Sequence, residues 1–293
     1  MTRDLRHPLL IVVALTAGSV VAAAARQAAF RTRTDAVIIH AAVTDGRKPV
    51  TTLTRDDFML RDSGVPQTLL DFDRETMPLD VTLVIDVSGS MTPPRLRGVE
   101  HAVSQVVAAM KPEDRCAVLS FTTPIIELVP LRRPPVNLNL ANRPAGGTAI
   151  RDALLLSLVN PPVLDRRQMV ILMTDGDDTT SFFDMGTVIE TAHYTSAQVS
   201  IVLAREGHDL KDGAMVVMLR EVSRSTGGEI LEIDRDGDLG KAFLAALENF
   251  RTSYVLRYVP AGVPASGWHE VDVKVKSKNY QIRARRGWAA PGG

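Results

Sequence analysis

Two short apolar runs, each followed within two residues by an aspartate, place the strongest limit on how this chain can fold. Residues 81–85 and 169–173 contain only Val, Ile, Leu, Met and Thr. Runs this short and this apolar favour strands buried on both faces. Asp86 and Asp175 follow them, at the carboxyl ends of the predicted strands, where ligands bind in an open α/β sheet. A solvated Ser/Gly turn after the first run is the alternative interpretation.

Between residues 78 and 251, buried strands alternate with amphipathic helices. Apolar residues recur every three or four positions in the predicted helices, and prolines stand where several of these helices begin or end. Strands are expected over 81–85, 116–121, 125–129, 169–173, 199–204 and 229–233, and helices over 96–110, 150–159, 187–196, 215–225 and 239–250. This order predicts an α/β fold with a doubly wound, mostly parallel sheet.

The segments on either side of this domain have the period-two alternation of strands. Val37, Ile39, Ala41 and Val43 alternate with other residues in the first segment, residues 35–76. The second segment, residues 252–290, alternates in the same way. Each segment is too small to be stable alone. We therefore expect the two small β flanks to pack together as one β lobe.

The first 25 residues have the pattern of an export signal. Arg3 and Arg6 precede an apolar stretch, residues 9–25, which closes in the small residues Ala23, Ala24 and Ala25. This predicts a protein exported to the periplasm or the extracellular space. The alternative is a retained membrane anchor, which is the only membrane contact that the sequence suggests. The single cysteine, Cys116, cannot form a disulfide within the chain, and it is expected to be a small buried strand residue.

The charge balance argues against a nucleic-acid partner. The chain has 34 basic and 34 acidic residues and only 5% aromatic residues. No stripe of basic residues is evident, and few rings are available to stack on bases.

Three segments bring oxygen donors to the predicted crevice. Asp86, Ser88 and Ser90 follow the first strand, Thr148 opens a helix, and Asp175 follows a later strand. The set contains no histidine or cysteine, which suits a hard cation such as Mg²⁺, Mn²⁺ or Ca²⁺ and disfavours zinc or copper.

The same three segments resemble a known metal site. Asp-Val-Ser-Gly-Ser at 86–90, Gly-Gly-Thr-Ala-Ile-Arg-Asp-Ala-Leu at 146–154 and Thr-Asp-Gly-Asp-Asp at 174–178 are similar to the metal-ion-dependent adhesion site (MIDAS) of von Willebrand factor A (VWA) domains. The resemblance covers residues 80–251. It implies that hydroxyls of the serines and the threonine bind the ion directly and that the two aspartates act largely through waters.

The flanks add a second resemblance. Val-Thr-Asp-Gly-Arg-Lys-Pro-Val at 43–50, Leu-Thr-Arg-Asp-Asp-Phe at 53–58, Gly-Val-Pro-Gln at 64–67 and Arg-Ala-Arg-Arg-Gly-Trp at 283–288 resemble exported bacterial "VWFA-related" proteins. In the wider family, an Asp or Glu side chain of a protein partner completes the coordination of the ion. The resemblance thus implies a protein-docking site and no catalysis.

Two alternatives remain open. A Mg²⁺-dependent phosphatase-like hydrolase would also place acids at strand ends, but such enzymes need a second carboxylate two residues after the nucleophile, where this chain has Ser88. The Gly-x-Ser-x-Gly elbow of serine hydrolases is also missing around Ser88 and Ser90. The other alternative is a structural module without a functional metal.

Three further acids near the motifs are not counted as ligands. Asp177 and Asp178 are expected to be solvated turn residues. Asp152 is expected to interact with the helix dipole or with backbone groups at the start of its helix.

Overall fold

The computed structural model describes residues 36–46, 48–74, 77–140, 146–163, 165–175, 177–205, 213–234, 237–276 and 280–290. The predicted export signal, residues 1–25, lies outside these ranges. Among the described residues, no helix is both long and apolar enough to cross a membrane.

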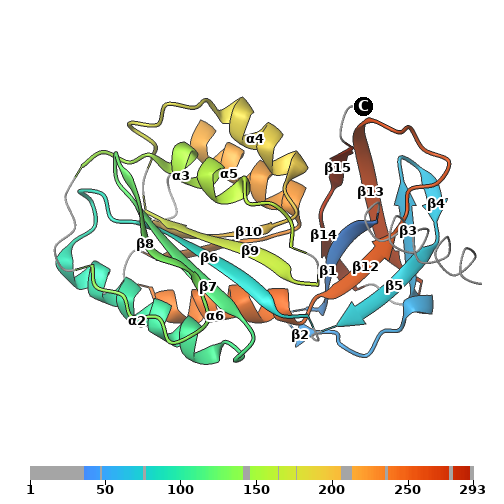
Figure 1. Cartoon of the computed structure of the whole chain (residues 1–293), viewed down its shortest axis with the longest axis horizontal. Coiled ribbons are helices and arrows are strands. Elements are labelled where there is room, and N and C mark those ends of the chain that lie inside the picture. The colour runs from blue at the N-terminus through green and yellow to red at the C-terminus, as the bar shows by residue number, and fades with distance from the viewer. Residues whose placement is uncertain are drawn as a thin grey trace, which may run out of the picture.

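The larger part of the protein is a sheet covered by helices on both faces (Figure 1). The strand order is β11-β10-β9-β6-β7-β8, and all neighbours are parallel except β7 and β8. The strands are β6 (Leu79–Asp86), β7 (Arg115–Phe121), β8 (Ile125–Arg132), β9 (Arg167–Thr174), β10 (Gln198–Arg205) and β11 (Ile230–Asp234). The predicted α/β fold with a mostly parallel sheet is confirmed.

Two groups of helices enclose the sheet (Figure 1). On one face lie α2 (Pro93–Ala109) and α6 (Leu239–Arg251), and on the other lie α3 (Ile150–Leu158), α4 (Met185–Tyr194) and α5 (Ala214–Thr226). Every residue of β6 is buried, because Val81, Leu83 and Ile85 belong to the core on the α2 and α6 side while Val84 belongs to the core on the other side. This double coverage is the physical reason for the continuous apolar run in the sequence.

The two flanks form one β lobe, as predicted. The N-terminal flank contributes β1 (Val37–Asp45), β2 (Lys48–Pro49), the 3₁₀ turn η1 (Arg55–Asp57), β3 (Phe58–Asp62), β4 (Val65–Gln67) and β5 (Leu69–Arg74). The C-terminal flank contributes β12 (Tyr254–Tyr258), β13 (Gly267–Val275), β14 (Gln281–Ala284) and β15 (Gly287–Ala290). Strand β12 lies between β1 and β5, and β13 pairs with β3, so strands of both flanks share sheets and one core.

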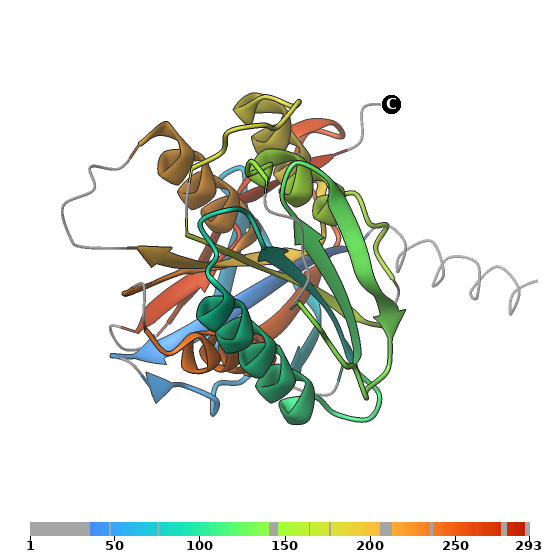
Figure 2. The same ribbon diagram turned by 90° about the vertical axis from the view of Figure 1, so that its left-hand side faces the viewer.

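The β lobe lies at the end of the central sheet where β6 begins (Figure 1). Arg285 of the lobe donates from Nη1 and Nη2 to the carbonyls of Thr195 and His193 at the end of α4, at 3.2 Å each. A positive group at a helix C-terminus satisfies free carbonyls and complements the dipole. The carboxyl ends of the parallel strands therefore point away from the lobe, and Figure 2 looks onto that free end.

Candidate metal site at the ends of β6 and β9

Asp86 is the last residue of β6, and its side chain is completely buried. Its Oδ1 accepts the Ser88 N–H at 2.9 Å, and its Oδ2 accepts the Thr174 hydroxyl at 2.7 Å. Burial raises the pKa of Asp86, and the nearby Asp175 raises it further, although the hydrogen bonds from Ser88 and Thr174 act in the opposite direction. Asp86 is thus held in one orientation by neutral donors.

A connected row of oxygen atoms leads from Asp86 through Ser88 and Ser90 to Asp175. The hydroxyls of Ser88 and Ser90 are 3.2 Å apart, and the Ser90 hydroxyl donates to Asp175 Oδ1 at 2.8 Å. The structure therefore brings together four of the five residues predicted from sequence, from the loops after two neighbouring strands. Parallel neighbours end at the same edge of a sheet, which is why residues 85 positions apart in sequence meet here.

Thr148, the fifth predicted residue, lies on a loop packed between these two loops. The Gly89 N–H donates to the Gly146 carbonyl at 3.2 Å, which joins this loop to the one after β6. On the other side, the Thr148 carbonyl accepts the Thr179 and Thr180 N–H groups at 2.8 and 3.2 Å. The Thr148 hydroxyl makes no hydrogen bond with any residue that the structure describes, so it is available to a ligand.

The glycine before Thr148 permits this close packing. A Cβ added at Gly147 would lie 2.3 Å from Cγ2 of Thr180. A larger residue at position 147 would force the side chain of Thr180, on the loop after β9, to move. The Gly-Gly-Thr sequence thus combines a close approach of two loops with an available hydroxyl.

Arg95 is the residue that sequence reasoning missed. It lies in the first turn of α2, and its Nη1 forms an ion pair with Asp175 Oδ2. The one available signal was electrostatic: a cation in the first turn of a helix opposes the helix dipole, so such a residue is expected to serve another purpose.

The prediction for Asp178 is wrong. Its carboxylate is almost fully buried and accepts the Arg151 N–H at 2.9 Å, Arg151 Nη2 at 3.0 Å and the Ser181 N–H at 3.1 Å. Burial raises its pKa, but these hydrogen bonds outweigh burial and hold the pKa below its ordinary value. Asp178 fixes the loop after β9 to the start of α3, whereas Asp177 is exposed, as expected.

Asp152 interacts with backbone groups, but not with those of its own helix. Its two carboxylate oxygens accept the N–H groups of Phe182 and Phe183 at 2.9 and 3.0 Å. The side chains of these phenylalanines remain outside, and Phe182 is 88% exposed. Asp152 therefore holds a pair of exposed aromatic rings next to the loop that contacts Thr148.

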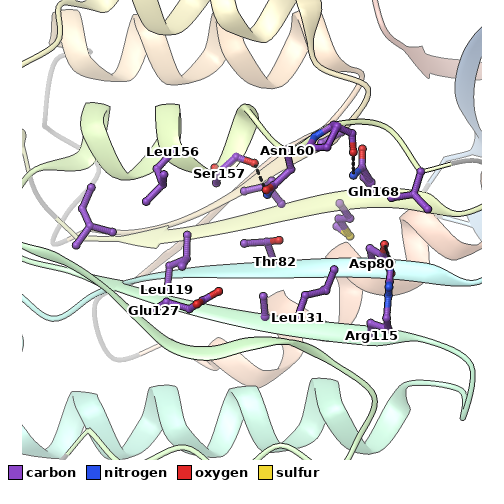
Figure 3. Close-up of a pocket in the computed structure, with 17 residues that line it drawn as sticks. Asp80, Thr82, Arg115, Leu119, Glu127, Leu131, Leu156, Ser157, Asn160 and Gln168 are labelled. Carbon is purple, nitrogen blue, oxygen red and sulfur yellow. Dashed lines mark hydrogen bonds and ion pairs between the residues drawn. The ribbon is translucent and has the colours of Figure 1, made fainter.

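A pocket of about 640 Å³ lies elsewhere, against β6, β7 and β8 near the end of α3 (Figure 3). Its lining includes Asp80, Glu127, Leu156 and Gln168, and none of the five predicted site residues. Asp80 accepts Nε–H groups of Arg115 and Arg166 at 2.8 and 2.7 Å, so its charge is already balanced. The candidate site and this pocket are separate.

Comparison with known proteins identifies the domain. The family model for the von Willebrand factor type A domain matches residues 81–177, a range that contains all five predicted residues. Residues 81–177 match the VWA family. This domain commonly mediates protein–protein interaction, and its homologues are typically non-catalytic.

Curated relatives match this chain over a minor part of their own length. Inter-alpha-trypsin inhibitor heavy chain H4 from Homo sapiens is 27% identical over 180 residues, which cover 56% of this chain and 19% of the relative. The Bos taurus protein of the same name is 30% identical over 120 residues, which cover 36% of this chain and 13% of the relative.

Solved structures that match this chain share little sequence with it. Proximal thread matrix protein 1 from the mussel byssus, with a zinc-occupied MIDAS motif, has a TM-score of 0.49 and 16% identity over 64% of this chain and 49% of that chain. A von Willebrand factor type A protein from Catenulispora acidiphila has a TM-score of 0.47 and 13% identity over 87% of this chain and 72% of that chain.

Proposed function

We propose that Asp86, Ser88, Ser90, Thr148 and Asp175 hold a divalent cation that binds an acidic side chain of another protein. The observation that carries this proposal is the row of oxygen atoms from Asp86 to Asp175, next to the loop of Thr148, which the Gly89 N–H joins through the Gly146 carbonyl. Oxygen-only donors suit Mg²⁺, Mn²⁺ or Ca²⁺.

The charges support docking of an acid. Three of the five donors are neutral hydroxyls, and Asp86 forms no ion pair with any residue that the structure describes. A cation held mainly by hydroxyls keeps much of its positive charge and attracts an anionic oxygen from outside. When bound, the ion supplies this charge, while the chain's own residues orient it at the open end of the sheet.

The exposed aromatic pair favours a protein partner over a small anion. The rings of Phe182 and Phe183 lie edge to face with centroids 5.3 Å apart, and Asp152 fixes the backbone beneath them. Aromatic residues held in place at a surface are common anchors of protein interfaces. We infer that the partner presents an apolar side chain close to its acidic one.

Three of the histidines that the structure describes belong to the β lobe or contact it. His40 and His269 belong to strands of the β lobe. The ring of His193 packs against the ring of Trp268 in that lobe, with the two ring centroids 4.1 Å apart. The β lobe lies at the end of the central sheet where β6 begins (Figure 1), whereas Asp86 is the last residue of β6. The exported location implied by residues 1–25 belongs to the same proposal.

Isothermal titration calorimetry with Mg²⁺, Mn²⁺ and Ca²⁺ tests the metal site. The wild type should bind at least one of these ions, and Asp86→Ala should abolish binding. Asp177→Ala is the matched control, since Asp177 is an exposed acid of the same loops. Equal binding by the wild type and Asp86→Ala would refute the site.

A second experiment tests the docking function. Protein loaded with Mn²⁺ should capture a partner that EDTA releases, and an Asp or Glu of that partner should be required. Capture that survives both EDTA and Asp86→Ala would place the interaction elsewhere. Hydrolysis of a phosphate ester or carboxylic ester that Asp86→Asn abolishes would favour the enzyme instead.

A further inference from the structure

Arg95 stands out because it is a cation at a site that is proposed to bind cations. Only 9% of its side chain and 2% of the Asp175 side chain are exposed. Its Nη1 pairs with Asp175 Oδ2, while Asp175 Oδ1 accepts the Ser90 hydroxyl. Arg95 thus contacts the same carboxylate as the row of proposed ligands.

Its surroundings give Arg95 little other reason to lie there. Its Nε and Nη2 atoms are buried and have no hydrogen-bond partner within the part of the chain that the structure describes. Unused donors of a buried guanidinium carry a desolvation cost, and the helix start adds an unfavourable interaction with the dipole. Attraction to the site's carboxylate is the favourable term that offsets these costs.

We propose that Arg95 is a tethered counter-ion, which neutralises Asp175 while no cation is bound and which an incoming divalent cation must displace. This inference rests on the proposed metal site. Two carboxylates in one crevice repel each other, and Arg95 relieves this repulsion in the metal-free protein. The same contact competes with the ion, so Arg95 lowers metal affinity and makes metal binding an exchange of one cation for another.

Calorimetry on two matched variants measures the competition. Arg95→Gln removes the charge at similar size, and Arg97→Gln removes the charge of an exposed arginine two residues further along α2. We expect Arg95→Gln to bind Mg²⁺ or Mn²⁺ about tenfold more tightly than the wild type, and Arg97→Gln to match the wild type. Arg95→Lys keeps the charge and should stay within about threefold of the wild type. Unchanged or weaker binding by Arg95→Gln would overturn the proposal.

Thermal unfolding in EDTA separates this inference from the metal site itself. Arg95→Gln should lower the Tm of the wild type and should have little effect in an Asp175→Asn background, because its partner charge is then absent. If neither the wild type nor any variant binds metal, the proposed function fails. The difference between the Tm effects of Arg95→Gln in the two backgrounds then still decides whether Arg95 is the counter-ion of Asp175. Equal effects of Arg95→Gln in both backgrounds would refute that role.

Discussion

The two ends of strand β6 each carry a buried aspartate, and their partners differ. Asp80, near the start, lies between the guanidinium groups of Arg115 and Arg166, whereas Asp86, at the end, is held by the Ser88 N–H and the Thr174 hydroxyl. The first acid has its charge balanced within the fold. The second is oriented but not balanced by any ion pair among the described residues. A buried acid held by neutral donors is therefore the better candidate for binding a cation.

The residues around each end of β6 differ in the same way as the two aspartates. Beside Asp80, Asp114 accepts from Arg251 at 2.8 Å and from the Leu79 N–H at 2.8 Å, which joins α6 to the start of β6. The fully buried Arg167 donates to the Arg251 carbonyl at 3.2 Å. The end near the β lobe is thus closed by internal ion pairs, and the other end has hydroxyls and the single ion pair between Arg95 and Asp175.

The largest expected effect comes from breaking the balanced end. Asp80→Asn leaves two guanidinium groups without their carboxylate, and we expect a loss of about 3 kcal/mol in the free energy of unfolding. Urea denaturation measures this loss. Asp272→Asn is the control: it breaks an exposed pair with Lys274 and should cost about 0.5 kcal/mol or less. Similar losses in both variants would show that the Asp80 ion pairs contribute little.

The same substitution at the carboxyl end of β6 should have a much smaller effect on the free energy of unfolding. Asp86→Asn removes a buried charge that burial disfavours and keeps a group of the same shape, so in EDTA the free energy of unfolding should change by about 1 kcal/mol or less. Added Mn²⁺ should stabilise the wild type and leave Asp86→Asn unchanged. A loss in EDTA as large as that of Asp80→Asn would remove the distinction between the two aspartates.

The β-lobe end should also contribute a pH dependence. Burial lowers the pKa of His40 well below its ordinary value, and the positive charges of Arg167, Arg285 and Arg257 lower it further. The unfolded chain therefore takes up this proton first, so stability should fall as the pH drops below about 6.5, by at most about 1.4 kcal/mol per pH unit. Between pH 6.5 and 5, urea denaturation should show this slope in the wild type and a shallower one in His40→Leu. Identical slopes would exclude His40 as its source.

The smallest stability effect is expected at the exposed aromatic pair. Phe182→Ser removes a ring that is 88% exposed, so the free energy of unfolding should change by about 0.5 kcal/mol or less. Capture of a metal-dependent partner should nevertheless weaken, which pull-down with Mn²⁺ measures. Val217→Ser, at an exposed apolar residue of α5, provides the control and should leave capture intact. Undiminished capture by Phe182→Ser would remove the aromatic pair from the interface.

The sequence could predict much of the site because its signals are local. Asp86, Ser88 and Ser90 are separated by one residue each, and the apolar run before them indicates a strand end. The pairing of the two flanks was also predictable, since neither could bury its apolar face alone. Arg95 was missed and Asp178 was assigned wrongly, because their contacts are with partners 80 and 27 residues away in sequence.

The sequence by itself determined the order of strands and helices, the two aspartates at strand ends and the hydroxyl side chains that follow the first of them. These features follow from periodicity and residue type, which any short segment carries with it. Only the tertiary structure decided which charges are balanced. It placed two arginines on Asp80 and one on Asp175, and it left Asp86 with neutral donors. Charge balance depends on distances between residues remote in the chain, and folding alone sets those distances.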